Sequence, residues 1–197
     1  MTKVFIKVNL FLLVLLISSC AVIPERSAPV RLHDLGPLPS HADRAPAPWA
    51  SVRVTAPEWL KDDRIRYRLA YADPTRVGVY TLDRWVAPPP ELVALRFNLS
   101  GDGGPFQIRI ELQAFEQIFE RPDFAKGVIR FRASVYDLGS RKRLAERTFE
   151  LDKVSPSPDA AGAVVSLANL ADEAIEEVRG WISRTDLMRE TSPQGTR

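Results

Sequence analysis

Residues 106–119, FQIRIELQAFEQIF, decide the fold because apolar and polar residues alternate along most of their length. A period of two places one row of side chains on each face of a β-strand, so that one face is buried and the other meets solvent. The apolar row comprises Phe106, Ile108, Ile110, Leu112 and Ala114. Phe115, Ile118 and Phe119 break the phase, so we expect a β-bulge or a twist near Ala114.

Two more strands are expected on the C-terminal side of this stretch. Residues 129–135 alternate in the same way, and a last strand is predicted over residues 143–151. Turn residues at 121–123 and 137–140 make both connections short. Strands joined by short connections are most simply antiparallel, so this half of the chain is predicted to be a β-meander.

Two helices are predicted to cover the sheet. The first begins near Pro89 and ends before Gly101, because proline suits the first turn and glycine suits the residue past the C-cap. Its buried side is expected to hold Leu92, Leu95, Arg96 and Leu99. The second follows Ser157, the predicted N-cap, and carries apolar residues at spacings of three and four from 164 to 182. The acidic residues expected to face solvent on it are Asp172, Glu173, Glu176 and Glu177.

Further strands are expected before the first helix. Short runs at 52–54 and 77–82 are typical of strands, and residues 64–71 alternate strictly. The polar face of the alternating run carries three arginines, Arg64, Arg66 and Arg68. The predicted fold class is therefore α/β in the α+β sense. We expect a single domain over residues 51–184, with a mixed, largely antiparallel sheet covered by two helices.

The N-terminus has the features of an exported protein. Residues 1–19 combine Lys3 and Lys7 with an apolar run that ends in small residues immediately before Cys20. This is the layout of a secretory signal peptide, and its apolar run is about half of the ~20 residues that a transmembrane helix needs. Cys20 is the only cysteine in the chain, so it has no internal disulfide partner.

Between Cys20 and the predicted domain lies a proline-rich segment. Residues 20–50 contain six prolines and few large apolar residues, which is typical of an extended tether. Residues 30–36 could form a short first strand within it. Fully extended, this tether would reach about 100 Å. At the other end of the chain, residues 185–197 are predicted to be a disordered tail.

Composition and residue order argue against several functions. Without Lys3 and Lys7 the 27 basic residues become 25, equal to the 25 acidic ones, so a basic surface for nucleic acid is not expected. His33 and His41 lie in the tether, where a catalytic or metal-binding pair is hard to hold. Residues 101–104 follow a helix and precede a strand, which is the reverse of a phosphate-binding loop. We expect no enzyme activity, no metal and no cofactor.

Several segments, in this order, resemble one known family. They are residues 67–71 (YRLAY), Arg84-Trp85 before a double proline and an apolar helix, and residues 112–119 (LQAFEQIF). Over about residues 30–183 the chain resembles the ABC-type transport auxiliary lipoproteins, the PqiC-like outer-membrane lipoproteins of MCE lipid-transport systems. The resemblance implies a mixed α/β domain and a non-catalytic role in moving phospholipid between membranes. It implies MCE-domain and ABC permease or ATPase partners, and it allows a homo-oligomer.

The segment Ile17-Ser18-Ser19-Cys20 resembles the bacterial lipobox. This resemblance implies that Cys20 is lipidated and that acyl chains such as palmitate hold the protein in the membrane. Ala21 is not the aspartate that favours retention at the inner membrane. The same resemblance therefore implies an outer-membrane protein that faces the periplasm. The alternative is ordinary secretion, with cleavage near Ser19 and an incidental cysteine.

The candidate contact residues are the three arginines of one strand, Arg64, Arg66 and Arg68. With Arg130 and Arg132 they could form a basic sheet face for lipid phosphates or an acidic partner. The alternative is a solvated row that pairs with neighbouring acids such as Asp62 and Asp63. For the whole protein, the alternative function is an envelope lipoprotein that tethers or activates a cell-wall or other envelope enzyme.

Overall fold

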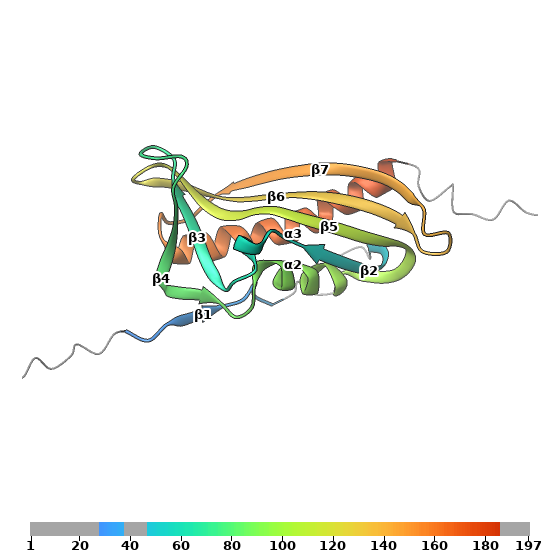
Figure 1. Cartoon of the computed structure of the whole chain (residues 1–197), viewed down its shortest axis with the longest axis horizontal. Coiled ribbons are helices and arrows are strands. Elements are labelled where there is room, and N and C mark those ends of the chain that lie inside the picture. Colours follow the sequence, from blue (N-terminus) through green and yellow to red (C-terminus); the bar gives the residue numbers. More distant parts are fainter. Residues whose placement is uncertain (1–27, 38–46, 186–197) are drawn as a thin grey trace, which may run out of the picture.

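A computed structural model of the chain describes residues 28–37 and 47–185. In these two ranges it contains one seven-stranded mixed sheet with two α-helices, which is the α+β fold class predicted from the sequence (Figure 1). The predicted signal peptide, Cys20 and the chain from residue 186 onward lie outside the described residues. Within the described ranges, the helices are too short or too polar to cross a bilayer.

Three long strands form the predicted antiparallel meander. They are β5 (Gly101–Arg121), β6 (Phe124–Asp137) and β7 (Arg143–Val154). The register between β5 and β6 shifts between Leu112 and Ala114, which confirms the predicted bulge.

The other edge of β5 is shared by two strands that run parallel to it. β2 (Ala47–Thr55) pairs with its first half and β3 (Arg64–Leu69) with its second half. A short 3₁₀-helix, η2 (Glu58–Leu60), lies between these two strands in the chain. β2 begins at Ala47, which lies before the predicted domain boundary at residue 51.

Two more strands extend the sheet beyond β3. β4 (Val77–Trp85) is antiparallel to β3, and β1 (Arg31–His33) is parallel to β4 and forms one edge of the sheet. β1 falls inside the 30–36 stretch of the predicted tether. The sheet therefore includes residues that lie only a short distance along the chain from Cys20.

The first helix, α2 (Pro89–Asn98), begins at the predicted proline but turns a different side to the core. Its buried residues include Leu92, Val93, Arg96 and Phe97, whereas Leu95 and Leu99 are exposed, so the predicted stripe was wrong for these two leucines. The reason is packing against β2. The indole of Trp49 lies 5.9 Å from the Phe97 ring and donates a hydrogen bond to the Phe97 carbonyl at 3.0 Å.

The long helix α3 (Ala160–Arg184) is capped at its N-terminus by Asp159. The prediction of Ser157 as the N-cap was therefore wrong. The Asp159 carboxylate accepts a hydrogen bond from the backbone N–H of Gly162 at 2.8 Å. Ser157 instead donates its hydroxyl hydrogen bond to Asp159 at 2.6 Å. A Cβ at position 162 would lie 1.9 Å from the Ser157 carbonyl oxygen, so only glycine fits this first turn.

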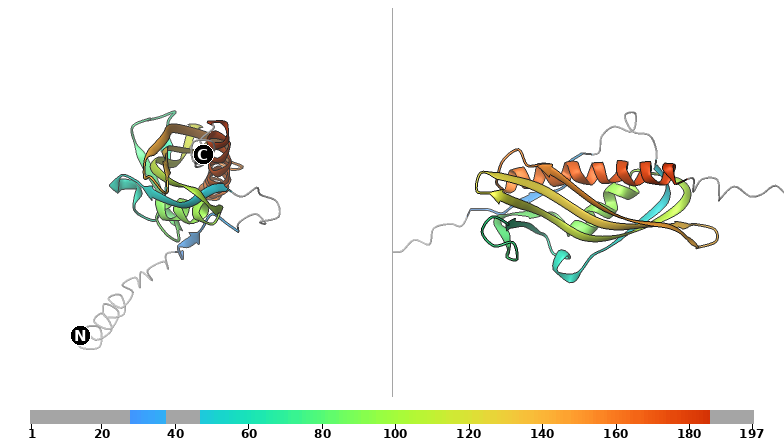
Figure 2. Two further views of the ribbon diagram at one scale, coloured as in Figure 1. Left: turned by 90° about the vertical axis from the view of Figure 1, so that its right-hand side faces the viewer. Right: turned by 90° about the horizontal axis from the view of Figure 1, so that it is seen from above.

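The core lies between the sheet and the two helices, with α3 running along the length of the sheet (Figure 2). Phe131 and Phe149 stack with ring centroids 5.0 Å apart, and Trp181 of α3 meets Phe149 edge-on at 5.7 Å. Each large apolar side chain that is fully buried contributes roughly 1.5–3 kcal/mol.

Candidate functional site

The arginine row predicted on β3 is occupied by contacts within the molecule. Arg66 is buried at 6% exposure and donates to Asp62 at 2.8 Å, and Arg64 pairs with the same carboxylate at 3.3 Å. Arg68 donates to both carboxylate oxygens of Glu116, which is itself buried, at 3.1 and 3.2 Å. The prediction that the arginine row is exposed was therefore wrong for Arg66. Trp59 of η2 covers its guanidinium, whose carbon lies 5.8 Å from the centroid of the Trp59 ring. That these arginines contact a partner or lipid stays a prediction.

The sheet face that points away from the helices carries a series of ion pairs. They are Lys126 with Glu120 and Asp152, Arg130 with Glu150, and Arg132 with Glu111. The hydrogen bonds that Arg130 donates lower the pKa of Glu150 below its usual range. Along most of this face, therefore, each cation has a carboxylate beside it. Arg130 and Arg132, which were predicted to add to a basic face, belong to this neutralised part.

The series ends in two arginines that have no carboxylate partner among the described residues. Arg53 of β2 and Arg109 of β5 are direct partners in the parallel register, and both are exposed. Like charges placed directly opposite one another on neighbouring strands destabilise a sheet. The guanidinium of Arg109 lies 4.2 Å from the ring centroid of Tyr136, in a cation–π contact that orients it.

These arginines line a cavity of about 210 Å³ that we term the arginine basin. Its lining includes Arg53, Arg109, Arg132, Ser134 and Tyr136, together with the carboxylates of Glu111 and Glu146. The Nε atom of Arg132 is buried there without a hydrogen-bond partner. A neighbouring cavity of about 340 Å³ shares Arg109 and Tyr136 and adds Arg141. Guanidinium groups in such an arrangement suit a carboxylate or a phosphate.

His33 lies in β1 and takes part in a structural cluster. Its Nε2 lies 2.8 Å from Oδ1 of Asp83, and Arg31 donates two hydrogen bonds to the same carboxylate at 2.9 and 2.8 Å. The hydrogen bond from Arg31 is the main reason that the pKa of Asp83 lies below its usual range. The cluster fastens β1 to β4. No group of three metal-ligating side chains is found in the parts of the chain described, residues 28–37 and 47–185.

A second buried cluster joins both helices to the chain after β1. Arg96 is 5% exposed and donates to the two carboxylate oxygens of Asp172 at 2.7 and 2.8 Å. Its third hydrogen bond goes to the carbonyl of Gly36 at 2.8 Å. The expectation that Asp172 faces solvent was therefore wrong. The signal in the sequence was an arginine in the apolar stripe of α2, which requires a buried acceptor.

No protein-family model matches the sequence, and neither does any curated protein. Among solved structures, a Xanthomonas campestris protein of the DUF330 family matches with a TM-score of 0.62 and 18% identity, over 75% of this chain and 91% of its own. An uncharacterised protein matches with a TM-score of 0.59 and 12% identity, over 79% of this chain and 99% of its own. The chain therefore shares its fold with both.

A candidate lipoprotein from Caulobacter crescentus is less similar to the chain. It matches with a TM-score of 0.35 and 11% identity, over 48% of this chain and 83% of its own, and this similarity is too low to carry a conclusion. The fold and the basin define a small α+β domain that buries one sheet face under helices and leaves a charged face open.

Proposed function

We propose that this chain is a lipid-anchored envelope protein that serves as a non-catalytic auxiliary component of an ABC/MCE-type phospholipid transport system. Lipidated Cys20 holds it in the outer membrane, and the domain faces the periplasm. The resemblance of residues 67–71, 84–89 and 112–119 to the PqiC-like lipoproteins supports the transport system. The observation that carries the docking role is the adjacent, uncompensated pair Arg53 and Arg109.

In this proposal the arginine basin docks onto an acidic surface of an MCE-domain protein or another transporter component. Each guanidinium presents a planar set of donors that matches a carboxylate, and a hydrogen bond to a charged group contributes roughly 1.5–3 kcal/mol. Docking also relieves the repulsion between Arg53 and Arg109. Anchoring the domain in one membrane raises its effective concentration for such a partner.

The test is crosslinking in cells of the full-length protein, followed by mild detergent extraction and mass spectrometry of the recovered proteins and lipids. The variants are Arg53→Glu with Arg109→Glu, and Arg76→Glu as the matched control, an exposed arginine in the turn between β3 and β4. We expect an MCE-domain protein or a permease with the unaltered protein and the control. Its recovery should fall about tenfold or more with the double variant.

Two outcomes would contradict the proposal. Equal recovery of the transporter component with the double variant would remove the arginine basin from docking. Recovery of a cell-wall enzyme alone, without phospholipid enrichment over a Cys20→Ala control, would favour an envelope lipoprotein that tethers or activates that enzyme. The same crosslinks would show whether the chain forms a homo-oligomer.

A further inference from the structure

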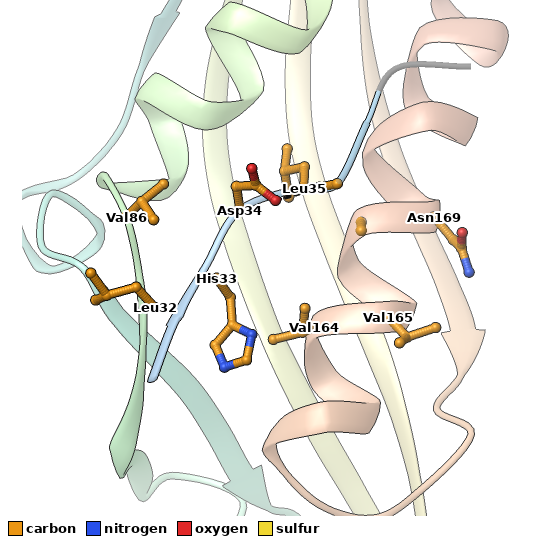
Figure 3. A pocket seen from close by; sticks show the side chains of 10 residues that line it. Leu32, His33, Asp34, Leu35, Val86, Val164, Val165 and Asn169 are labelled. Carbon is orange, nitrogen blue, oxygen red and sulfur yellow. Dashed lines mark hydrogen bonds between the residues drawn. The ribbon is translucent and has the colours of Figure 1, made fainter. Parts of the chain in front are cut away.

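Exposed apolar side chains gather at the end of the sheet where the chain arrives from Cys20. Leu32 of β1 and Val86, which follows β4, line one cavity of about 490 Å³ and lie on the same side of it (Figure 3). We define the N-terminal apolar patch as four exposed residues: Val30 (46%), Leu32 (64%), Leu82 (40%) and Val86 (53%). Single exposed apolar residues are common, but a group on two neighbouring strands indicates a contact surface.

The strand register explains why these side chains lie together. Leu32 is the partner of Arg84 in the parallel pair of β1 and β4, and partner residues share a face of the sheet. Leu82 and Val86 lie two residues before and after Arg84, where a period of two returns to that face. The same cavity is also lined by Val164 and Val165 of α3, with His33 and Asp34 between them and Leu32 (Figure 3).

The two arginines beside this patch are already neutralised, and Asp34, which is exposed and lines the same cavity, pairs with no cation among the described residues. Arg84 pairs with Asp63 at 2.9 Å, and Arg31 pairs with Asp83 at 2.8 Å. The patch therefore offers apolar area without the excess positive charge that attracts an anionic surface from a distance.

The chain length between Cys20 and β1 limits how far this patch can lie from a lipid anchor. Ten residues separate Cys20 from Arg31, and a fully extended chain of that length spans about 35 Å. Arg31 and His33 are fixed to Asp83, so the connection ends there and not at residue 51. The reach of about 100 Å expected for the whole tether does not apply to this end of the domain.

We propose that the N-terminal apolar patch lies against the phospholipid bilayer in which Cys20 is anchored. This inference rests on the lipid anchor of the proposed function. Leu32 and Val86 enter the headgroup region, and the turn between β6 and β7, at the opposite end of the domain, points away from the membrane (Figure 1). Because Arg31 and Arg84 are both paired, no free positive charge attracts the bilayer, so the contact is apolar and salt should not weaken it.

The experiment uses the full-length lipidated protein in vesicles of phosphatidylethanolamine and phosphatidylglycerol. A thioether at Cys20 leaves no other thiol in the chain, so Leu32→Cys, Val86→Cys and Leu138→Cys each accept a single nitroxide. Leu138 is the matched control because it is 49% exposed and lies in the β6–β7 turn. The ratio of oxygen to nickel-chelate accessibility should be about threefold higher at positions 32 and 86 than at 138, at low and at high salt.

Three other results would overturn the inference, and each has its own signature. Equal, aqueous ratios at all three positions would show that the patch does not touch the bilayer. Dipolar broadening between labels at position 32 would show that a second copy covers it. An intact mass without lipid on Cys20 would overturn the anchor itself, and with it the proposed function.

Discussion

The two ends of the sheet expose opposite kinds of surface. At the β1 end the arginines are paired with Asp83 and Asp63, and the aliphatic side chains of the N-terminal apolar patch are exposed beside them. At the other end, the arginine basin holds Arg53 and Arg109 without a carboxylate partner in the described parts of the chain. One fold thus presents an apolar surface beside the predicted anchor and a cationic surface away from it.

This difference separates arginines that hold the fold from arginines that are available to a partner. Arg66, Arg68 and Arg96 all direct their guanidinium groups to carboxylates of the same molecule. Arg53 and Arg109 do not, and they repel each other across β2 and β5. The first kind should lower stability when it is removed, and the second kind should not.

The largest loss of stability is expected at the cluster of Arg96, Asp172 and the Gly36 carbonyl, which joins both helices to the chain after β1. Asp172→Ala leaves the Arg96 guanidinium buried without its carboxylate, so the free energy of unfolding should fall by about 3 kcal/mol. Chemical denaturation measures this loss. Glu177→Ala on the same helix is the control and should change stability by less than about 0.5 kcal/mol. Equal losses in the two variants would show that the cluster does not stabilise the fold.

A smaller loss is expected in acid. The hydrogen bonds from Arg31 hold the pKa of Asp83 below its usual range, and those from Ser157 and the Gly162 N–H do so for Asp159. A carboxylate with a depressed folded-state pKa stabilises the protein above its unfolded-state pKa, which is about pH 4, and this stabilisation is lost as the pH falls through the folded-state value.

The unfolding free energy should therefore decrease below about pH 4. Arg31→Met removes the main cause at Asp83, so the decrease should be less steep in this variant. Denaturant titrations of both proteins between neutral and acid pH measure the two slopes. Identical slopes would contradict the coupling of β1 to β4 through Asp83.

The smallest expected changes in unfolding free energy have opposite signs for an unpaired and for a paired arginine. Arg53→Gln removes a repulsion and should raise the unfolding free energy by about 0.5 kcal/mol while weakening partner recovery. Arg130→Gln removes an exposed ion pair with Glu150 and should lower the unfolding free energy by about 0.5 kcal/mol. The recovery of the crosslinked partner should not change in this variant. Matched denaturation curves measure both changes. The same sign in both variants would remove the distinction between the two kinds of arginine.

The sequence predicts what local periodicity controls. The meander, the bulge near Ala114 and the start of α2 at Pro89 follow from residues that are close along the chain. The parallel pairing of β2 and β3 with β5 does not, because it depends on contacts across intervening elements. Sequence periodicity predicted Leu95 and Leu99 in the core, whereas the structure buries Val93 and Phe97, and Phe97 packs against Trp49.

The candidate site was predictable only in part. Alternation places Arg53 and Arg109 on the polar face of two strands, but only the register makes them neighbours. The pairing of Arg64 and Arg66 with Asp62 confirms the alternative of neighbouring acids that the sequence offered. The partner of Arg68, Glu116, comes from another strand and was not predicted. Cys20 lies outside the described residues, so its lipidation stays a prediction from the lipobox resemblance.

Site-specific photocrosslinking in living cells tests the division between the two ends most directly. Benzoylphenylalanine replaces Arg53 in one full-length protein and Val86 in another, and mass spectrometry identifies what each position captures. We predict that position 53 captures a transporter component and that position 86 captures phospholipid. The same polypeptide captured from both positions, or phospholipid captured at position 53 alone, would contradict the proposed division of the molecule.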